Sequence, residues 1–331
     1  MLSRTVAGIA LGAGVVLGAA CGPAPTDGQA VAPSAAAGAP TDVAELVGKL
    51  RDMAWAGQVD EAQALIEAQR PHHDAASADW LLAASWLGRG ASFADQWDVA
   101  EQYANEAREG SVALLAARDL DADAQLPLAL GAGIEVLGQA KHARGDKDGA
   151  VQFLSEERER YRGTSIETRI QKNALLVGLE GEPFPELDVE DHLGPGPPSA
   201  DSLQGKVVVA FFWAHWCPDC KRQLPALEQL HETYGEQVAI IGPTQLYGYI
   251  ARGEDATPEQ ELAYLRGDYQ ERFPVPDWMS VPISQQNFLD FGVSTTPTLV
   301  VIDREGIVRL YNPGDLPYEE LAPHVERLLG D

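Results

Sequence analysis

Residues 41–180 carry apolar side chains at intervals of three and four, and runs of β-branched residues are scarce there. This spacing gathers the apolar residues on one side of a helix, so it predicts an all-helical region. We expect antiparallel helices of about ten to twenty residues each. The predicted breaks between them lie at Gly57, Arg70-Pro71, Gly88-Arg89-Gly90, Gly110, Asp121–Asp123, Gly145 and Gly163.

Two segments of this region, residues 57–66 (GQVDEAQALI) and 145–154 (GDKDGAVQFL), share a Gly followed by an Ala five residues later. The pattern resembles tetratricopeptide helix pairs, in which a small residue lets the second helix pack closely against the first. The candidate small residues Ala62, Ala100 and Ala150 are spaced irregularly, whereas that family repeats at about 34 residues. The resemblance therefore implies a degenerate helical array. Large aromatic residues supply much of the burial in such arrays, so Trp80, Trp86 and Trp97 are expected in the core.

From residue 181 the helical spacing gives way to Pro- and Gly-rich sequence and then to continuous apolar runs. VVVAFFW (207–213) is typical of a strand covered on both faces. The predicted order continues with a helix at 217–234, a strand at 237–242, a helix at 257–273, a hairpin at 296–303 and 307–311, and a helix at 317–329. This is the order of a thioredoxin-like α/β domain. The chain is thus predicted to be multidomain, with an all-α helical-repeat domain at 41–180 and an α/β thioredoxin-like domain at 181–331.

The N-terminus has the layout of a secretory signal. Residues 1–20 contain one basic residue, Arg4, and then an uncharged run that is shorter than the about 18–20 apolar residues of a spanning helix. Small residues directly before Cys21 resemble the cleavage box of bacterial lipoproteins, in which that Cys is lipidated. Residues 21–40 are rich in Ala, Pro and Gly, a composition that forms a disordered tether. The alternative is an ordinary cleavage site with an incidental Cys.

The chain has 50 acidic and 24 basic residues and a formal charge of −26. Such a surface repels phosphate backbones, so we expect no nucleic-acid partner. A signal peptide with a lipid anchor predicts an exported protein of the cell envelope, held to a membrane, where disulfides are permitted.

Cys217 and Cys220 are three residues apart, at the predicted junction of a strand and a helix. Unpaired N–H groups and the helix dipole stabilise a thiolate at the helix start, and Cys220, one turn later, can attack a mixed disulfide on Cys217. A zinc site would need four ligands, and the chain has no second CxxC or CxxH pair. A static disulfide would close too short a loop to stabilise much. Ala210 and Ala214 stand where a peroxide-reducing site would have Pro and Thr.

Residues 181–331 resemble the TlpA/ResA-like thioredoxins, exported bacterial thiol-disulfide oxidoreductases. The resemblance rests on residues around the dithiol and on one distant dipeptide: Trp213, Ala214, Trp216, Pro225 and Thr296-Pro297. It implies that Cys217 and Cys220 are catalytic and that Pro225 kinks the active-site helix. It also implies that Thr296 and Pro297 form a cis-proline loop that lies beside the dithiol and binds an extended client segment.

The chain departs from this family at several active-site neighbours. Phe211 occupies the position of the buried acid that takes the proton from the second Cys in many thioredoxins. His215, if protonated, would favour the Cys217 thiolate, although an exposed polar residue is common in that position. Pro218 and Asp219 separate the two cysteines, and the charge of Asp219 opposes the thiolate. The neighbouring cations Lys221 and Arg222 could offset that charge.

The segment 243–283 is long for this family, and an added helix there flanks the active site. Substrate choice is therefore expected in this segment. Its aromatic residues either line a binding face or pack in the core: Tyr247, Tyr249 and Trp278.

Together these features predict a membrane-tethered, extracytoplasmic thiol-disulfide oxidoreductase that acts on protein disulfides, as a reductant, without a cofactor or metal. Its expected partners are client thiols and disulfides, an electron donor such as a membrane thiol reductase, and a protein bound by the helical domain. The alternative is a helical-repeat binding module with a redox-inactive thioredoxin scaffold. An intact CxxC argues against inactivity.

Overall fold

The structure is a computed structural model, and it describes residues 41–196 and 200–330. The predicted signal peptide, the tether and Cys21 lie outside the described residues. Among the residues that it does describe, none of the helices is both long enough and apolar enough to cross a membrane.

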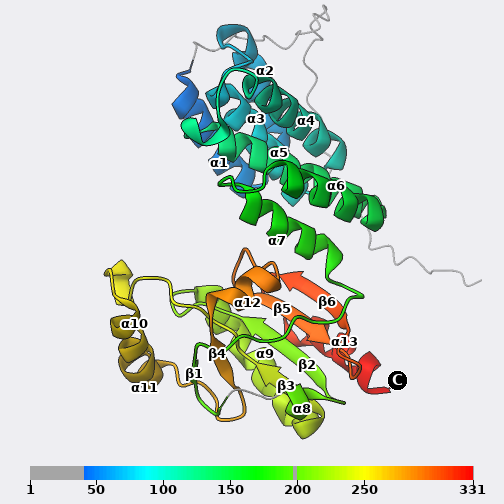
Figure 1. The fold of residues 1–331 in the computed structure, drawn as a ribbon, viewed down its shortest axis with the longest axis vertical. Coiled ribbons are helices and arrows are strands. Elements are labelled where there is room, and N and C mark those ends of the chain that lie inside the picture. Colours follow the sequence, from blue (N-terminus) through cyan, green and yellow to red (C-terminus); the bar gives the residue numbers. More distant parts are fainter. Residues whose placement is uncertain (1–40, 197–199, 331) are drawn as a thin grey trace, which may run out of the picture. The chain divides into compact units, whose positions relative to one another are not determined.

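Seven helices form the first part of the described chain, as the spacing of apolar residues predicts (Figure 1). They are α1 (Val43–Trp55), α2 (Val59–Gln69), α3 (Ala78–Phe93), α4 (Trp97–Leu114), α5 (Leu126–Ala143), α6 (Lys147–Arg160) and α7 (Glu167–Gly178). Helix α3 packs against α1, α4 and α5, and α5 packs in turn against α6 and α7. Trp80 and Tyr103 are fully buried between α3 and α4, whereas Trp86 and Trp97 are half-buried at the edge of this core.

Two of the predicted helix breaks are wrong, because the glycines at those places serve close packing. Gly88 and Gly90 lie inside α3, and Gly110 lies inside α4. A Cβ on Gly88 would be 3.2 Å from the backbone N of Ala104, and a Cβ on Gly110 would be 2.4 Å from a methyl carbon of Leu81. A Cβ at either position would crowd the neighbouring helix, so glycine favours this close approach. The chain turns between α3 and α4 at Asp95 instead, which has a left-handed φ of 56°.

A four-stranded sheet follows, in the order β3-β2-β5-β6. Its strands are β2 (Val207–Phe212), β3 (Val238–Ile241), β5 (Thr298–Ile302) and β6 (Val308–Pro313). Strand β2 is parallel to β3 and antiparallel to β5, and β5 is antiparallel to β6. These are the predicted strands, and the predicted fold class, helices followed by a mixed α/β thioredoxin-like domain, is confirmed. Two short strands that were not predicted, β1 (Asp191–Leu193) and β4 (Val281–Ile283), form a separate antiparallel pair.

Side chains of β2 alternate between two cores, which explains its continuous apolar run. Val209 and Phe211 pack with α9 (Pro218–Tyr234) and α13 (Tyr318–Gly330) on one face. Val208 and Phe212 pack on the other face with α12 (Gln285–Asp290) and the end of the short helix α8 (Ala200–Leu203). The sheet is therefore covered on both faces (Figure 1).

The end of the helical region joins the second of these cores. Leu175 and Leu176 of α7 pack against it, and Lys172 Nζ donates a hydrogen bond to the carbonyl oxygen of Val293 at 2.8 Å. The carboxylate of Glu180 accepts a bond from the backbone N–H of Tyr311 on β6, at 2.7 Å. The predicted boundary at residue 180 thus lies within a packed segment.

The segment 243–283 contains the predicted additional helix, in three pieces. They are α10 (Pro258–Tyr264), a π-helical turn (Leu265–Tyr269) and α11 (Gln270–Arg272). Thr257 begins α10 with a capping box, in which its hydroxyl accepts the N–H of Gln260 and the Gln260 side chain accepts the N–H of Thr257. This inserted helix supplies one wall of the site described next.

Candidate active site

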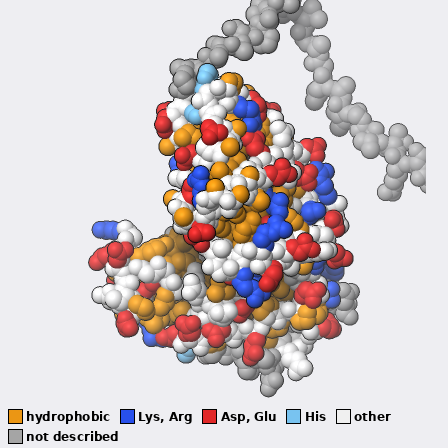
Figure 2. Space-filling model, turned by 45° about the horizontal axis from the view of Figure 1, so that its top comes forward, with side chains coloured by type: hydrophobic (Ala, Val, Ile, Leu, Met, Phe, Trp, Pro, Cys, Tyr) orange, Lys and Arg blue, Asp and Glu red, His pale blue; other side chains and the backbone are white. Residues whose placement is uncertain are grey.

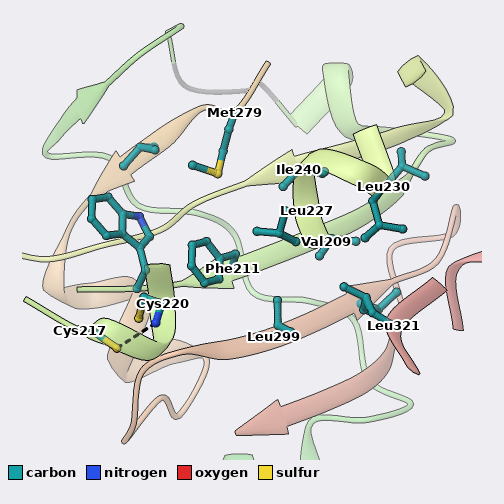
Figure 3. Packing of buried hydrophobic residues seen from close by; sticks show 14 of the residues in the cluster. Val209, Phe211, Cys217, Cys220, Leu227, Leu230, Ile240, Met279, Leu299 and Leu321 are labelled. Atoms are coloured by element: carbon teal, nitrogen blue, oxygen red, sulfur yellow. Dashed lines mark hydrogen bonds between the residues drawn. The ribbon is translucent and has the colours of Figure 1, made fainter. Parts of the chain in front are cut away.

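Cys217 lies at the junction of β2 and α9, as the N-cap residue of α9. Its Sγ accepts a hydrogen bond from the backbone N–H of Cys220 at 3.2 Å, the dashed line in Figure 3. Pro218, at the first position of the helix, has no N–H that would need a partner. The sulfur of Cys217 therefore takes the place of a capping oxygen and lies at the positive end of the helix dipole.

The other neighbour of Cys217 is the loop at residues 295–298. The Thr296-Pro297 peptide bond is cis. Cys217 Sγ donates to the carbonyl oxygen of Thr296 at 3.3 Å, so the thiol is held between this carbonyl and the helix start. The carbonyl of Pro297 accepts the N–H of Gly314 at 2.8 Å. The loop and the dithiol, which are 79 residues apart in sequence, are thus in contact.

Cys220 lies one turn into α9 and faces the core of the domain. Both cysteines are free thiols, and Cys217 and Cys220 are only 3% and 2% exposed. Phe211, Leu227 and Met279 belong to the same buried cluster (Figure 3). Burial, followed by the contact with Cys217, raises the pKa of the Cys220 thiol well above its usual range. Cys220 therefore keeps its proton at neutral pH, in a pocket where Phe211 offers no base.

Two tryptophans lie near the dithiol, one buried and one partly exposed. The indole N–H of Trp213 donates to the carbonyl of Gly242 at 2.9 Å, and its ring stacks on Tyr269 at 5.6 Å. Trp216 is 47% exposed and contacts the rings of Tyr247 and Tyr249 at 5.6 and 6.4 Å. Trp213 thus supports the site from inside, while Trp216 presents an apolar surface directly before Cys217.

His215 lies in a buried cage of aromatic side chains, whereas an exposed polar residue is common at this position in the family that the sequence resembles. Its ring contacts four tyrosines of the inserted segment, Tyr247, Tyr249, Tyr264 and Tyr269. Desolvation lowers the pKa of His215, although nearby Glu261 acts in the opposite direction. Most His215 side chains are therefore neutral at pH 7, so the positive charge that would favour the Cys217 thiolate is largely absent.

Glu261 on α10 completes this cage and was missed by the sequence analysis. It is fully buried, and its carboxylate accepts the backbone N–H groups of Tyr247 and Gly248 at 2.8 to 3.0 Å. His215 Nε2 lies 3.2 Å from Oε1 of Glu261, but outside hydrogen-bonding geometry. Nothing in the residue pattern of α10 singles out this glutamate, because acidic side chains are common in a first helical turn.

The remaining predicted neighbours lie on the exposed side of α9. Asp219 pairs with Arg222 at 2.6 Å, so its charge is offset within one helical turn. The ammonium of Lys221 lies over the ring of Phe273, 4.1 Å from its centroid. Pro225 lies inside α9, and the amide of nearby Gln223 bonds both backbone groups of Leu316 at 2.7 and 2.9 Å. These contacts hold α9 against the segment that precedes α13.

Comparison with known proteins agrees with this geometry. Residues 202–329 match the family model of a thioredoxin-like domain. The thiol:disulfide interchange protein DsbE of Allochromatium vinosum is 30% identical over 159 residues, which cover 46% of this chain and 78% of that protein. ResA, a thiol-disulfide oxidoreductase of Geobacillus thermodenitrificans, is 26% identical over 161 residues, which cover 48% of this chain and 81% of that protein. The thioredoxin-like protein YneN of Bacillus subtilis is 24% identical over 152 residues (45% and 81%).

Proposed function

Because this chain belongs to the thioredoxin-like thiol-disulfide oxidoreductases, we propose that it reduces protein disulfides through the CPDC dithiol, Cys217 and Cys220. The position of the Cys217 sulfur is the main observation that supports this proposal. Cys217 Sγ lies between the N–H of Cys220 and the carbonyl of Thr296, at 3.2 and 3.3 Å. A sulfur in this position is poised at a helix start and faces the loop that would bind a client.

The reaction proceeds by two exchanges. The Cys217 thiolate attacks one sulfur of a client disulfide, forms a mixed disulfide and releases the other client sulfur as a thiolate, which takes up a proton. Cys220 then loses its proton and attacks Cys217 Sγ, which releases the second client thiol and leaves a Cys217–Cys220 disulfide. Two electrons pass to the client, and an external dithiol donor must return them. The chemistry is symmetric, so the reductive direction rests on the resemblance to ResA.

Insulin reduction with dithiothreitol as the donor tests this proposal. We expect the wild-type protein to turn over and the Cys217→Ser variant to be inactive. Cys21→Ser is the matched control, since it removes a cysteine that has no role in the proposed exchange. Equal turnover by wild type and Cys217→Ser would refute the proposal.

We also propose that residues 1–20 are a signal peptide, that Cys21 carries a lipid and that residues 21–40 tether two domains, 41–180 and 181–331, in the cell envelope. Small residues before Cys21 and the Ala/Pro/Gly composition after it support this arrangement. Cys21→Ala should move the protein from the membrane to the soluble fraction. A variant that still sediments with membranes would contradict lipid anchoring.

A further inference from the structure

A cleft of about 850 Å³ lies between the helical region and the loop before Pro297. Thr295 and Thr298 belong to its wall on the α/β side. Trp55, Phe93 and Trp97 belong to its wall on the helical side. The reaction proposed above uses none of these aromatic residues.

The cleft reaches the loop that contacts Cys217, because Thr295 and Thr298 line it. Thr295 precedes Thr296, whose carbonyl oxygen lies 3.3 Å from Cys217 Sγ. Consecutive Cα atoms are about 3.8 Å apart, so a client segment bound along this loop would enter the cleft within a few residues of its cysteine. The bond from Lys172 Nζ to the carbonyl of Val293 ties the helical wall to this loop.

The helical wall presents aromatic surface that the described residues leave uncovered. Trp55 is 66% exposed and Phe93 is 47% exposed, and their rings stack with centroids 5.2 Å apart. Large exposed aromatic rings that are held in place by a neighbour are typical anchors for a protein partner. The ring of half-buried Trp86 also contacts Trp55, with the two ring centroids 6.5 Å apart.

The charge of the cleft is opposite to that of the chain. Three cations and one carboxylate, Arg89, Arg169, Lys172 and Glu135, are among its lining residues. Glu135 pairs closely with Arg169 at 2.7 Å, while Arg89 Nε is 3.5 Å from Glu135 and lacks a hydrogen-bond partner among the described residues. The Arg89 guanidinium lies over the Trp86 ring at 4.7 Å. Acidic and basic side chains are both spread over the visible surface (Figure 2), whereas cations outnumber carboxylates in the lining of the cleft.

We propose that this cleft binds the client segment beside the target cysteine and selects segments that combine acidic with aromatic or large apolar side chains. The carboxylates would meet Arg89 and Lys172, and the apolar groups would pack on Trp55 and Phe93. This inference rests on the proposed reductase function, because it assigns the cleft to that enzyme's substrate.

Binding is measured first, without turnover, on the Cys217→Ser/Cys220→Ser protein. The ligands are two fluorescently labelled peptides with one cysteine, one carrying Phe and Glu on both sides of it and the other carrying Phe and Lys. The test variants are Trp55→Ser and Arg89→Gln. Leu128→Ser and Arg162→Gln are matched controls, since these side chains are exposed and do not line the cleft.

We expect the acidic peptide to bind about tenfold more tightly than the basic one, equivalent to about 1.4 kcal/mol. Trp55→Ser should weaken binding of both peptides, and Arg89→Gln should weaken only the acidic one and reduce the salt dependence. Both controls should bind as the parent protein does. Equal Kd for the two peptides, or Kd unchanged in both test variants, would overturn the inference.

Turnover then separates this inference from the function on which it rests. In the active protein, Trp55→Ser and Arg89→Gln should raise KM for a disulfide-linked acidic peptide with kcat unchanged. They should leave reduction of 2-hydroxyethyl disulfide, which is too small to reach the cleft, unaffected. If the protein binds the acidic peptide selectively but reduces neither substrate, the proposed reductase function is refuted and the proposed binding role of the cleft stands. Reduction of both substrates without selective binding would refute the cleft alone.

Discussion

His215 Nε2 lies 3.2 Å from Oε1 of Glu261, and neither side chain is more than 3% exposed. His215 is two residues before Cys217, and Glu261 belongs to the inserted helix. The pair therefore connects the insertion to the dithiol segment, through one carboxylate that also accepts two backbone N–H groups.

Buried His215 should make stability fall in mild acid. Desolvation lowers its pKa below the ordinary value of 6.5, so the unfolded chain binds the proton first as pH falls. The contribution of neutral His215 to the free energy of unfolding is complete above about pH 6.5. Below that pH it declines by at most about 1.4 kcal/mol per pH unit. Glu261 and Lys221 are the charged groups that act on this ring. Urea unfolding of wild type between about pH 7.5 and 5 measures the slope.

His215→Gln should remove this part of the pH dependence, whereas His192→Gln, at an exposed position, should leave it unchanged. Identical slopes in the wild type and both variants would show that His215 does not cause the acid sensitivity.

Resolution of a mixed disulfide on Cys217 should accelerate with pH. Burial raises the pKa of Cys220, so the attacking thiolate becomes up to tenfold more abundant with each pH unit below that pKa. Rapid-mixing release of a labelled client between about pH 6 and 9 should show a continuous rise. A release rate that reaches a plateau near neutral pH would mean that a nearby base accepts the proton of Cys220. That result would contradict the apolar surroundings of this thiol.

Gly292→Ala should loosen the contact between α7 and the loop that leads to the active site. Gly292 has a φ of +70°, and a Cβ there would lie 2.5 Å from Leu175 Cβ and 2.8 Å from the Lys172 carbonyl oxygen. We expect a loss of about 2–4 kcal/mol in the free energy of unfolding from overpacking and backbone strain together.

Gly163→Ala is the matched control for that change. Gly163 has a similar φ of +77° with no atom within 4 Å of the added Cβ, so it reports the backbone strain alone. Urea unfolding measures the loss in the free energy of unfolding for each variant. Equal losses in the two variants would show that crowding against α7 adds nothing to the effect of Gly292→Ala.

The sequence predicts those features of the molecule that depend on residues close together in the chain. The dithiol, the strand before it and the helix after it lie within one short segment, and their apolar run and CxxC spacing identify them. Gly88 and Gly110 misled the prediction, because a glycine that ends a helix and one that permits close packing look alike in sequence.

The remaining features depend on contacts between distant segments. Glu261 becomes recognisable only when the inserted helix packs over His215. Trp55 and Phe93 stack although they come from α1 and α3, and Trp55 was not singled out at all. Helical spacing shows which residues share a side of one helix, but it does not show which side meets a loop more than a hundred residues away.

Mass spectrometry of trapped client adducts tests the central claim most directly. Cys220→Ser removes the resolving thiol, so incubation with a disulfide-bonded peptide should leave a stable adduct whose client sulfur is joined to Cys217. Cys217→Ser should form no adduct under the same conditions, and the wild type should release the reduced peptide. Adducts of equal yield on both variants, or attachment to Cys220 in the wild type, would contradict the assignment of Cys217 as the nucleophile.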